Sequence, residues 1–366
     1  MNFLISYKYF IMSIIYLVSF SLCLELFSRL FFYISEKDIL AFKKYPGRYK
    51  NSYFSGYGLS PNWSLENNGL KETINSYGLR SPEFQFKKNK DTYRIICLGS
   101  SVVYGRGNDD ETFPFQLEEK LNNMNLNGVT FEVINAGIPG YTSYHTSTQL
   151  LTSLIDLKPD LVISYQLFNE LWYYFERNNE KMNSQNFHSI TNISSYERIL
   201  DKSYFLTIIN SISRKYKSQI SDNNDILNQN EIIENTRIYD DKVLHYYKRN
   251  INFMAMACEY LDITLILSTP LSLYKEKNTE EEKKYIYDHN NKDFYLKLIN
   301  EGNKILNIIS KKHDGVYYFN PSNYIKSNLS TLEDRYHPTS LGNALIGEEY
   351  KKLILNLNLM HRGIQN

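Results

Sequence analysis

Short apolar runs alternate with longer amphipathic stretches between residues 92 and 357. The five runs are rich in β-branched residues, as buried strands are; they are Tyr93–Leu98, Thr130–Asn135, Leu161–Gln166, Ile263–Ser268 and Val316–Asn320. The helical patterns between and after them cover about Phe113–Asn122, Tyr144–Leu157, Asp241–Tyr260, Lys292–Lys311 and Ser340–Leu357. Because strands that alternate with helices form parallel sheets, the pattern predicts an α/β fold. We expect a parallel sheet of about five strands with helices on both faces.

The N-terminus carries a longer apolar stretch. No charged residue occurs from Tyr9 to Leu24, and apolar residues continue around Glu25 and Arg29. A helix of roughly 20 apolar residues crosses a bilayer. We therefore predict one N-terminal transmembrane helix near residues 7–27, within a membrane anchor at 1–34. Glu25 and Arg29 are spaced to pair on one helix face near the membrane interface, with Arg29 reaching toward the headgroups.

Two other interpretations of this stretch are disfavoured. A cleaved signal peptide would need a small-x-small pattern after the apolar residues, and none follows. A lipoprotein at Cys23 would need a small residue before the cysteine, where the chain has Leu22.

The charges around the predicted span conflict over the membrane side. Lys8 precedes the span, and a larger basic group follows it: Arg29, Lys37, Lys43, Lys44, Arg48 and Lys50. The charge rule favours a cytoplasmic position for the large domain. A short N-terminal tail ahead of an uncleaved signal-anchor favours export instead. We expect the large domain to be extracytoplasmic.

Two further segments interrupt the alternation of strands and helices. Residues 35–90 are rich in Tyr, Asn, Gly and Pro, which predicts an extended or loop-built lead-in. Residues 171–240 combine aromatic patches with an Asn-rich middle, which indicates an insertion with a helix around Tyr204–Ile220. This insertion is either a lid or membrane-facing flap, or a helical excursion with no role in binding.

Composition excludes several classes of function. The net charge of +1 results from 41 basic and 40 acidic residues without a dominant basic block, so we expect no nucleic-acid partner. Three cysteines are too few for a disulfide framework. No Cys/His spacing suggests a metal site, and we expect no cofactor.

Polar residues suited to acyl transfer follow the predicted strands. A serine on a tight turn and a distant Asp-x-x-His supply a nucleophile, a base and an orienting carboxylate. Four segments carry these groups: Gly99-Ser100-Ser101 with Gly105, Asn135–Thr142, Phe168-Asn169-Glu170 and Asp334-Arg335-Tyr336-His337. Taken singly, the first resembles a phosphate-binding or corner turn, and the last could belong to a helix cap. Their joint occurrence at strand ends favours catalysis.

The order and spacing of these segments resemble the SGNH or GDSL-type hydrolases, a family of esterases and acyl transferases. The resemblance covers residues 92–357 in outline. It also includes Asn75–Glu83, which is similar to a segment upstream of the nucleophile in membrane-anchored bacterial members. It implies a flavodoxin-like three-layer α/β/α sandwich and assigns residues 91–360 to an SGNH hydrolase-like catalytic domain.

The resemblance also implies roles for individual residues. The nucleophile is Ser101, because Gly105 stands six residues after Gly99 as the motif requires. Ser100 then occupies the position of the family's Asp. The base is His337, and Asp334 orients its ring.

An oxyanion hole is implied in the same way. Its donors are the backbone N–H groups of Ser101 and Gly140 and the side-chain amide of Asn169. Two residues depart from the family pattern, because Leu167 replaces a common glycine and Glu170 replaces the usual Asp. The third segment is therefore the weakest match.

These inferences predict a membrane-anchored serine esterase that hydrolyses an acyl ester, with an O-acetyl ester as one option. The substrate is an acyl ester, with a carbohydrate as one possible alcohol component. An O-acyltransferase that modifies a surface polysaccharide is one alternative. A non-catalytic anchored binding module of the same fold is another. The sequence leaves the oligomeric state open.

Overall fold

The computed structural model describes residues 2–35, 47–170 apart from 53, 68 and 127, 203–206, 208, 209, 212, 244–286 and 292–357. Most of the predicted insertion at 171–240, part of the lead-in and the last residues of the chain lie outside this description. The chain divides into two compact units, each described by itself: Met1–Lys50 with Asn192–Asn235, and Asn51–Thr191 with Thr236–Asn366.

The first unit contains the long helix α1 (Asn2–Ser35). Within it, Tyr7–Phe31 has a mean hydropathy of 2.1 and none of its most apolar window is buried. By length and composition it is the one helix among the described residues that could cross a membrane. A signal sequence would have the same length and composition.

A five-stranded parallel sheet forms the centre of the second unit. Its strands are β5 (Thr92–Gly99), β6 (Thr130–Asn135), β7 (Leu161–Tyr165), β8 (Thr264–Ser268) and β9 (Val316–Tyr318). They lie in the order β6-β5-β7-β8-β9, with every neighbouring pair parallel. This is the flavodoxin-like order, in which ligands bind beyond the carboxyl ends of the strands where the order reverses. The predicted fold class is confirmed, including the number of strands.

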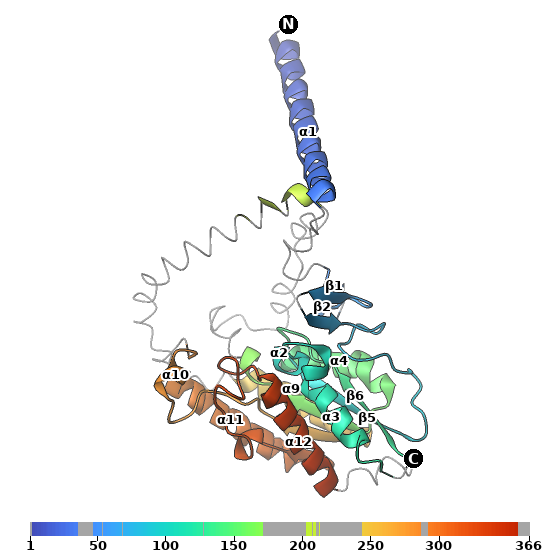
Figure 1. The fold of residues 1–366 in the computed structure, drawn as a ribbon, viewed down its shortest axis with the longest axis vertical. Coiled ribbons are helices and arrows are strands. Elements are labelled where there is room, and N and C mark those ends of the chain that lie inside the picture. The colour runs from blue at the N-terminus through green and yellow to red at the C-terminus, as the bar shows by residue number, and fades with distance from the viewer. Residues whose placement is uncertain are drawn as a thin grey trace. The chain divides into compact units, whose positions relative to one another are not determined.

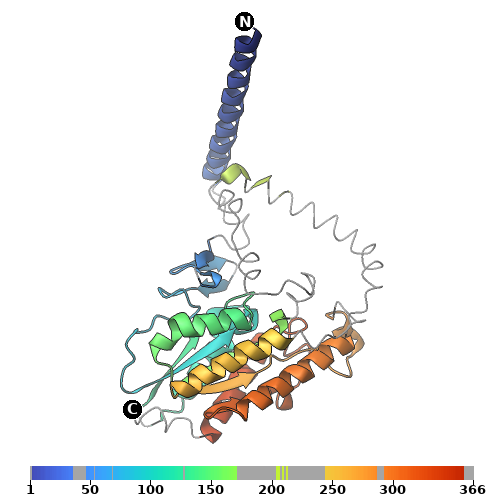
Figure 2. The ribbon, with the colours of Figure 1, turned by 180° about the vertical axis from the view of Figure 1, so that it is seen from behind.

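Helices cover both faces of the sheet (Figures 1 and 2). One face carries α3 (Phe113–Asn122) and α12 (Ser340–Asn356), which pack on each other. The other carries α4 (Ser143–Gln149), α9 (His245–Tyr260) and α11 (Lys292–Ser310). The predicted helix at Tyr144–Leu157 changes after Gln149 to a π-helical turn and then a 3-10 turn. The short helices α2 (Ser101–Tyr104) and α10 (Glu280–Lys283) were not predicted.

Burial explains why the strands are continuous apolar runs. All five residues of β7 and of β8 are buried, because helices pack on both sides of a parallel sheet. Arg94 is a charged residue in β5; its fully buried guanidinium pairs with Glu132 of β6 and donates to the Leu157 carbonyl. A charged group at this depth is tolerated because its donors are paired.

The lead-in contains four short strands rather than loops alone. They are β1 (Tyr49–Ser52), β2 (Gly56–Leu59), β3 (Ser64–Asn67) and β4 (Leu70–Thr73). Strands β3 and β4 form an antiparallel hairpin, with Ser64 opposite Thr73. The strands β1 and β2 form a second two-stranded sheet.

The loop after β6 lies directly against α2 at Gly137. A Cβ atom at Gly137 would lie 2.3 Å from the backbone nitrogen of Tyr104. We expect Gly137→Ala to displace α2 and to lower the free energy of unfolding by about 1–3 kcal/mol. Urea unfolding at neutral pH measures this. Gly58→Ala is the matched control, because no atom lies within 4 Å of its Cβ position. Equal stability of the two variants would contradict the close approach.

Candidate active site

Ser101 stands on a tight turn at the carboxyl end of β5. The strand ends at Gly99, Ser100 is the N-cap, and Ser101 is the first residue of α2. Only glycine fits at position 99, because a Cβ there would lie 2.5 Å from the carbonyl oxygen of Tyr165. The first N–H groups of a helix have no acceptor inside it. Among the described residues, the N–H of Ser101 has no hydrogen-bond acceptor.

The imidazole of His337 lies between Ser101 and Asp334. Its Nε2 is 2.8 Å from Ser101 Oγ, and its Nδ1 is 2.8 Å from Asp334 Oδ2 and 3.0 Å from Oδ1. His337 is 7% exposed, so the ring is largely shielded from water. The structure thus brings three side chains into contact, although Ser101 and His337 are 236 residues apart in the chain. The ring can accept a proton from the hydroxyl while the carboxylate holds the opposite N–H.

The turn that carries Asp334 and His337 is closed by its own hydrogen bonds. Asp334 Oδ1 accepts the N–H groups of Tyr336 and His337, both at 3.0 Å. The N–H of Glu333 donates to the His337 carbonyl at 2.9 Å. Burial alone would raise the pKa of Asp334, but the bond and charge of His337 and the two N–H groups hold that pKa well below its ordinary value. Asp334 is therefore ionised at neutral pH and can orient the ring.

Gly140 lies in a turn after β6. The N–H of Tyr141 donates to the Ile138 carbonyl at 3.1 Å, and Gly140 has a φ of 86°, which glycine adopts without strain. The hydroxyl of Tyr57, in β2 of the lead-in, donates to the Pro139 carbonyl at 2.6 Å. The N–H of Gly140 has no hydrogen-bond acceptor in the part of the chain that is described. The turn therefore carries one N–H group that can serve a ligand.

Asn169 joins the loop after β7 to this turn. Its side-chain amide donates to the Tyr141 carbonyl at 2.9 Å. The neighbouring Leu167 packs against α11, where a Cβ at Gly302 would lie 3.0 Å from the Leu167 side chain. Leu167 therefore fills the space beside α11 that is open because Gly302 has no side chain.

Glu170 is a buried carboxyl group beside the predicted amide donor. It is 3% exposed, and it accepts the N–H of Ser143 at the start of α4. Asn250 of α9 donates to the Ser143 hydroxyl at 3.0 Å, which extends the network to the helix layer. Desolvation by burial raises the pKa of Glu170 to about 7, against the opposing effect of the Ser143 bonds. The sequence showed only that Glu replaces Asp here; its burial depends on contacts with α4 and α9.

Arg80 of the lead-in supports the end of α2. Its side chain is 1% exposed, and it donates to the carbonyls of Tyr104, Gly105 and Gly107 at 3.2, 2.9 and 2.7 Å. It also pairs with Asp109 at 2.9 Å, and Asp109 accepts two hydrogen bonds from Thr73. The last carbonyls of a helix need donors; Arg80 supplies one to Tyr104, the last residue of α2, and others to the two glycines that follow, while Asn135 donates to the carbonyls of Val103 and Tyr104. Arg80 lies in the Asn75–Glu83 segment described under Sequence analysis.

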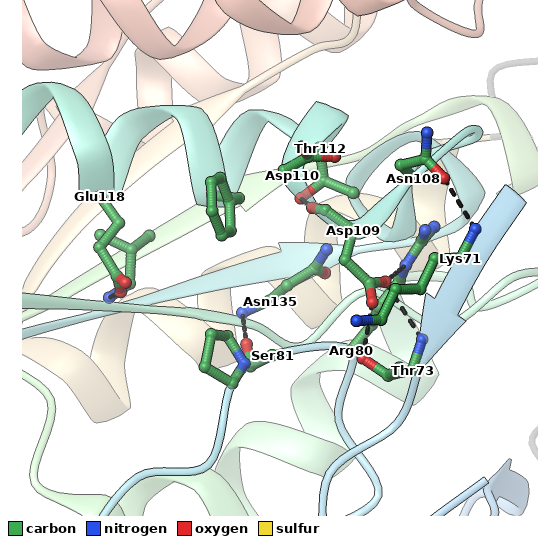
Figure 3. Close-up of a pocket in the computed structure, with 13 residues that line it drawn as sticks. Lys71, Thr73, Arg80, Ser81, Asn108, Asp109, Asp110, Thr112, Glu118 and Asn135 are labelled. Carbon is green, nitrogen blue, oxygen red and sulfur yellow. Dashed lines mark hydrogen bonds and ion pairs between the residues drawn. The ribbon is translucent and has the colours of Figure 1, made fainter. Parts of the chain in front are cut away.

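A cavity of about 450 Å³ lies beside the Arg80 network. Figure 3 shows Arg80 and Thr73 directed at Asp109, and Ser81 bonded to the backbone of Asn135. None of the three residues Ser101, Asp334 and His337 lines this cavity. It is separate from the site at the carboxyl ends of the strands.

Arg106 is a charged residue at this site that sequence reasoning missed. Its guanidinium is 3.0 Å from Asp334 Oδ2 and 3.3 Å from Glu333. The Arg106 side chain is 46% exposed, so the pair contributes little to stability. Nothing in the local sequence around Arg106 indicates this contact, because its partners lie more than two hundred residues away.

Two other described histidines, His145 and His313, have ordinary hydrogen-bond partners, and His245 makes a ring contact with Tyr246. His145 bonds Thr142 at the start of α4, and His313 bonds Glu259 at 2.7 Å. In the part of the chain that the structure describes, no group of three or more His, Cys, Asp or Glu residues could hold a metal ion.

Comparison with known proteins adds only a fold likeness. No family model and no curated protein matches the chain. Similar solved structures include a GDSL-like lipase from Bacteroides thetaiotaomicron, with 16% identity over 75% of this chain and 93% of that chain and a TM-score of 0.39. A mutant acetylxylan esterase from Geobacillus stearothermophilus has 11% identity over 71% of this chain and 93% of that chain, with a TM-score of 0.41. An acetyl xylan esterase has 13% identity over 71% of this chain and 99% of that chain, with a TM-score of 0.42. At these TM-scores the likeness carries no functional argument, which rests on the contacts described above.

The raised pKa of Glu170 predicts a pH-dependent stability. Between its ordinary pKa of 4.5 and about 7, the folded protein binds more protons at Glu170 than the unfolded chain does. The free energy of unfolding therefore falls as the pH rises from 4.5 to about 7. Glu170→Gln stays neutral, and its side-chain oxygen can still accept the Ser143 N–H. We expect the variant to gain roughly 3 kcal/mol relative to the parent between pH 5 and pH 8.

Urea unfolding at both pH values, with the parent protein alongside, measures the difference. Glu66→Gln, at an exposed position of β3, is the control and should leave the pH dependence unchanged. If the free energy of unfolding of Glu170→Gln varies with pH as that of the parent does, the Glu170 carboxyl ionises in the folded protein without loss of stability, which would contradict the prediction.

Proposed function

We propose that this protein is a membrane-anchored serine esterase that hydrolyses an acyl ester through an acyl-enzyme on Ser101. An O-acetyl ester is one such substrate. The observation that carries the proposal is the continuous contact from Ser101 Oγ through the His337 ring to Asp334, with 2.8 Å on each side of the ring. A neutral serine needs such a base to become a nucleophile.

In the proposed reaction, Ser101 Oγ attacks the ester carbonyl while His337 Nε2 removes the hydroxyl proton. Asp334 stabilises the imidazolium that forms. His337 then returns the proton to the leaving alcohol. Water, activated by the same ring, attacks the acyl-enzyme, and the acid is released as Ser101 is regenerated.

The negative charge on the tetrahedral oxygen needs donors fixed in advance. We assign the N–H groups of Ser101 and Gly140 to this role, because neither has an acceptor among the described residues. Asn169 is the third donor. Its amide carries two N–H bonds, of which one holds the Tyr141 carbonyl and the other serves the substrate.

The alternative acceptor is a sugar hydroxyl, which would make the protein an O-acyltransferase for a surface polysaccharide. The same acyl-enzyme serves both reactions, so Ser101 and His337 keep their roles. Acetylated product that accumulates from an oligosaccharide acceptor would identify the transferase. The Ser101–His337 contact favours either reaction over a non-catalytic binding module.

The apolar stretch Tyr7–Phe31 supports the anchor. We place the catalytic domain on the extracytoplasmic side, as expected from the sequence. A membrane-impermeant probe that reacts with Ser101 only after cells are permeabilised would contradict this side.

Replacement of the nucleophile tests the proposed reaction. Ser101→Ala should lower the turnover of p-nitrophenyl acetate by at least roughly 10³-fold, because among the described residues Ser101 supplies the one hydroxyl that hydrogen-bonds His337. Ser100→Ala is the matched control, because the Ser100 side chain makes no capping hydrogen bond to α2. We expect this control to retain turnover within a few-fold of the parent. Loss of turnover in Ser100→Ala alone would move the nucleophile by one residue.

A further inference from the structure

The exposure of α1 changes abruptly near its C-terminal end. Every described side chain from Tyr7 to Cys23 is exposed. Further along, Leu24 and Glu25 are half-buried and Ser28 is buried, at 5% exposure. These three positions share one face of the helix. Something within the same compact unit therefore covers one face of α1 at this level.

The covering segment begins at Ser203 in the predicted insertion. Glu25 accepts hydrogen bonds from the Ser203 hydroxyl at 2.7 Å and from the N–H groups of Tyr204 and Phe205, both at 3.1 Å. Arg29 pairs with Glu25 at 2.8 Å, and its guanidinium lies 4.7 Å from the centre of the Tyr204 ring. Figure 1 shows this short helical piece, in yellow-green, beside the end of α1. Glu25 thus caps the start of the piece from another helix.

The position of Glu25 along α1 places these contacts at a membrane boundary. The uncharged stretch from Tyr9 to Leu24 is roughly 24 Å long at the helical rise of 1.5 Å per residue. A hydrocarbon core of about 30 Å would therefore have Lys8 near one boundary and Glu25 near the other. A carboxylate there is costly unless it is paired and hydrogen-bonded. Arg29 and the three donors of the 203–205 backbone and side chain meet that need.

The described exposed side chains of the helical piece are apolar. Ile209 is 46% exposed and Ile212 is 64% exposed. The half-buried residues near them are also apolar: Phe205, Leu206 and Ile208. A short apolar helical segment fixed at the depth of Glu25, with an Arg–Tyr pair beside it, has the composition of an interfacial element.

We propose that residues 203–206, 208, 209 and 212 form a second membrane contact, which lies in the bilayer interface with Ile209 and Ile212 among the lipid acyl chains. The occupant of this apolar surface is the lipid bilayer itself. The proposal rests on the anchor stated under Proposed function. It gives these residues of the insertion a defined role, because Glu25 holds them at the membrane.

Tryptophan quenching by brominated lipids tests this contact in the full-length protein. The protein is reconstituted in phosphatidylcholine and phosphatidylglycerol vesicles after Trp63→Phe and Trp172→Phe remove the native tryptophans. Single reporters are then introduced as Ile212→Trp, as Leu17→Trp in the anchor, and as Tyr260→Trp at an 88% exposed position of α9. Turnover of p-nitrophenyl acetate verifies that each variant is folded.

We expect Ile212→Trp to be quenched most by bromine near the glycerol end of the acyl chains. Leu17→Trp should be quenched most by bromine near the methyl end, and Tyr260→Trp by neither. An unquenched Ile212→Trp with a quenched Leu17→Trp would overturn the second contact and leave the anchor intact. If Leu17→Trp is also unquenched, the anchor and the second contact both fail.

The role of Glu25 has a separate test in the Ile212→Trp protein. Glu25→Ala removes the acceptor for the 203–205 donors and should weaken the quenching of the reporter. Ser21→Ala, one turn before Glu25 on α1, is the control and should leave the quenching unchanged. Equal quenching in both variants would show that Glu25 does not hold the segment.

Discussion

The site depends on one imidazole ring held at both of its nitrogens. His337 contacts Ser101 through Nε2 and Asp334 through Nδ1, so the tautomer and the direction of the ring are set together. The two partners come from different parts of the fold. Ser101 follows β5, the first strand of the sheet along the chain, whereas Asp334 and His337 precede α12. The parallel sheet makes the contact possible, because strand ends and the loops around them meet at one edge.

The lead-in acts as structural support for both halves of this edge. Tyr57 holds the turn that contains Gly140, and Arg80 satisfies the carbonyls that end α2. A buried arginine is costly unless its donors are paired. Here it is matched to three carbonyls and to Asp109, so the charge also fixes the backbone after Ser101. A segment that was predicted as an extended connection is therefore part of the site's framework.

Local patterns predicted the fold well because its elements have strong hydrophobic periods. The runs at Thr130–Asn135 and Phe113–Asn122 agree with β6 and α3 to the residue. The α/β alternation then determined the class of sheet. Patterns failed where an element is too short to show a period, as in the four residues of α2, or where a helix changes its hydrogen bonding, as after Gln149.

The site itself was only partly visible in the sequence. Ser101, His337 and Asp334 were assigned through the resemblance to the SGNH or GDSL-type hydrolases; the structure brings their side chains into contact, and their catalytic roles stay predictions. Arg106, Arg80 and the burial of Glu170 were not identified from the sequence, because each depends on contacts between segments far apart in the chain. The bonds between Glu25 and Ser203 belong to the same class. Spacing can place a charge on a helix face, but it does not reveal the distant segment that pairs with it.

The most direct test of the central claim is whether Ser101 is chemically activated by His337. Peptide mass spectrometry of the protein after treatment with a fluorophosphonate measures this. We predict one adduct, on Ser101, and its loss in a folded His337→Ala variant. No adduct on Ser101, or equal labelling in His337→Ala, would contradict activation of Ser101 by His337.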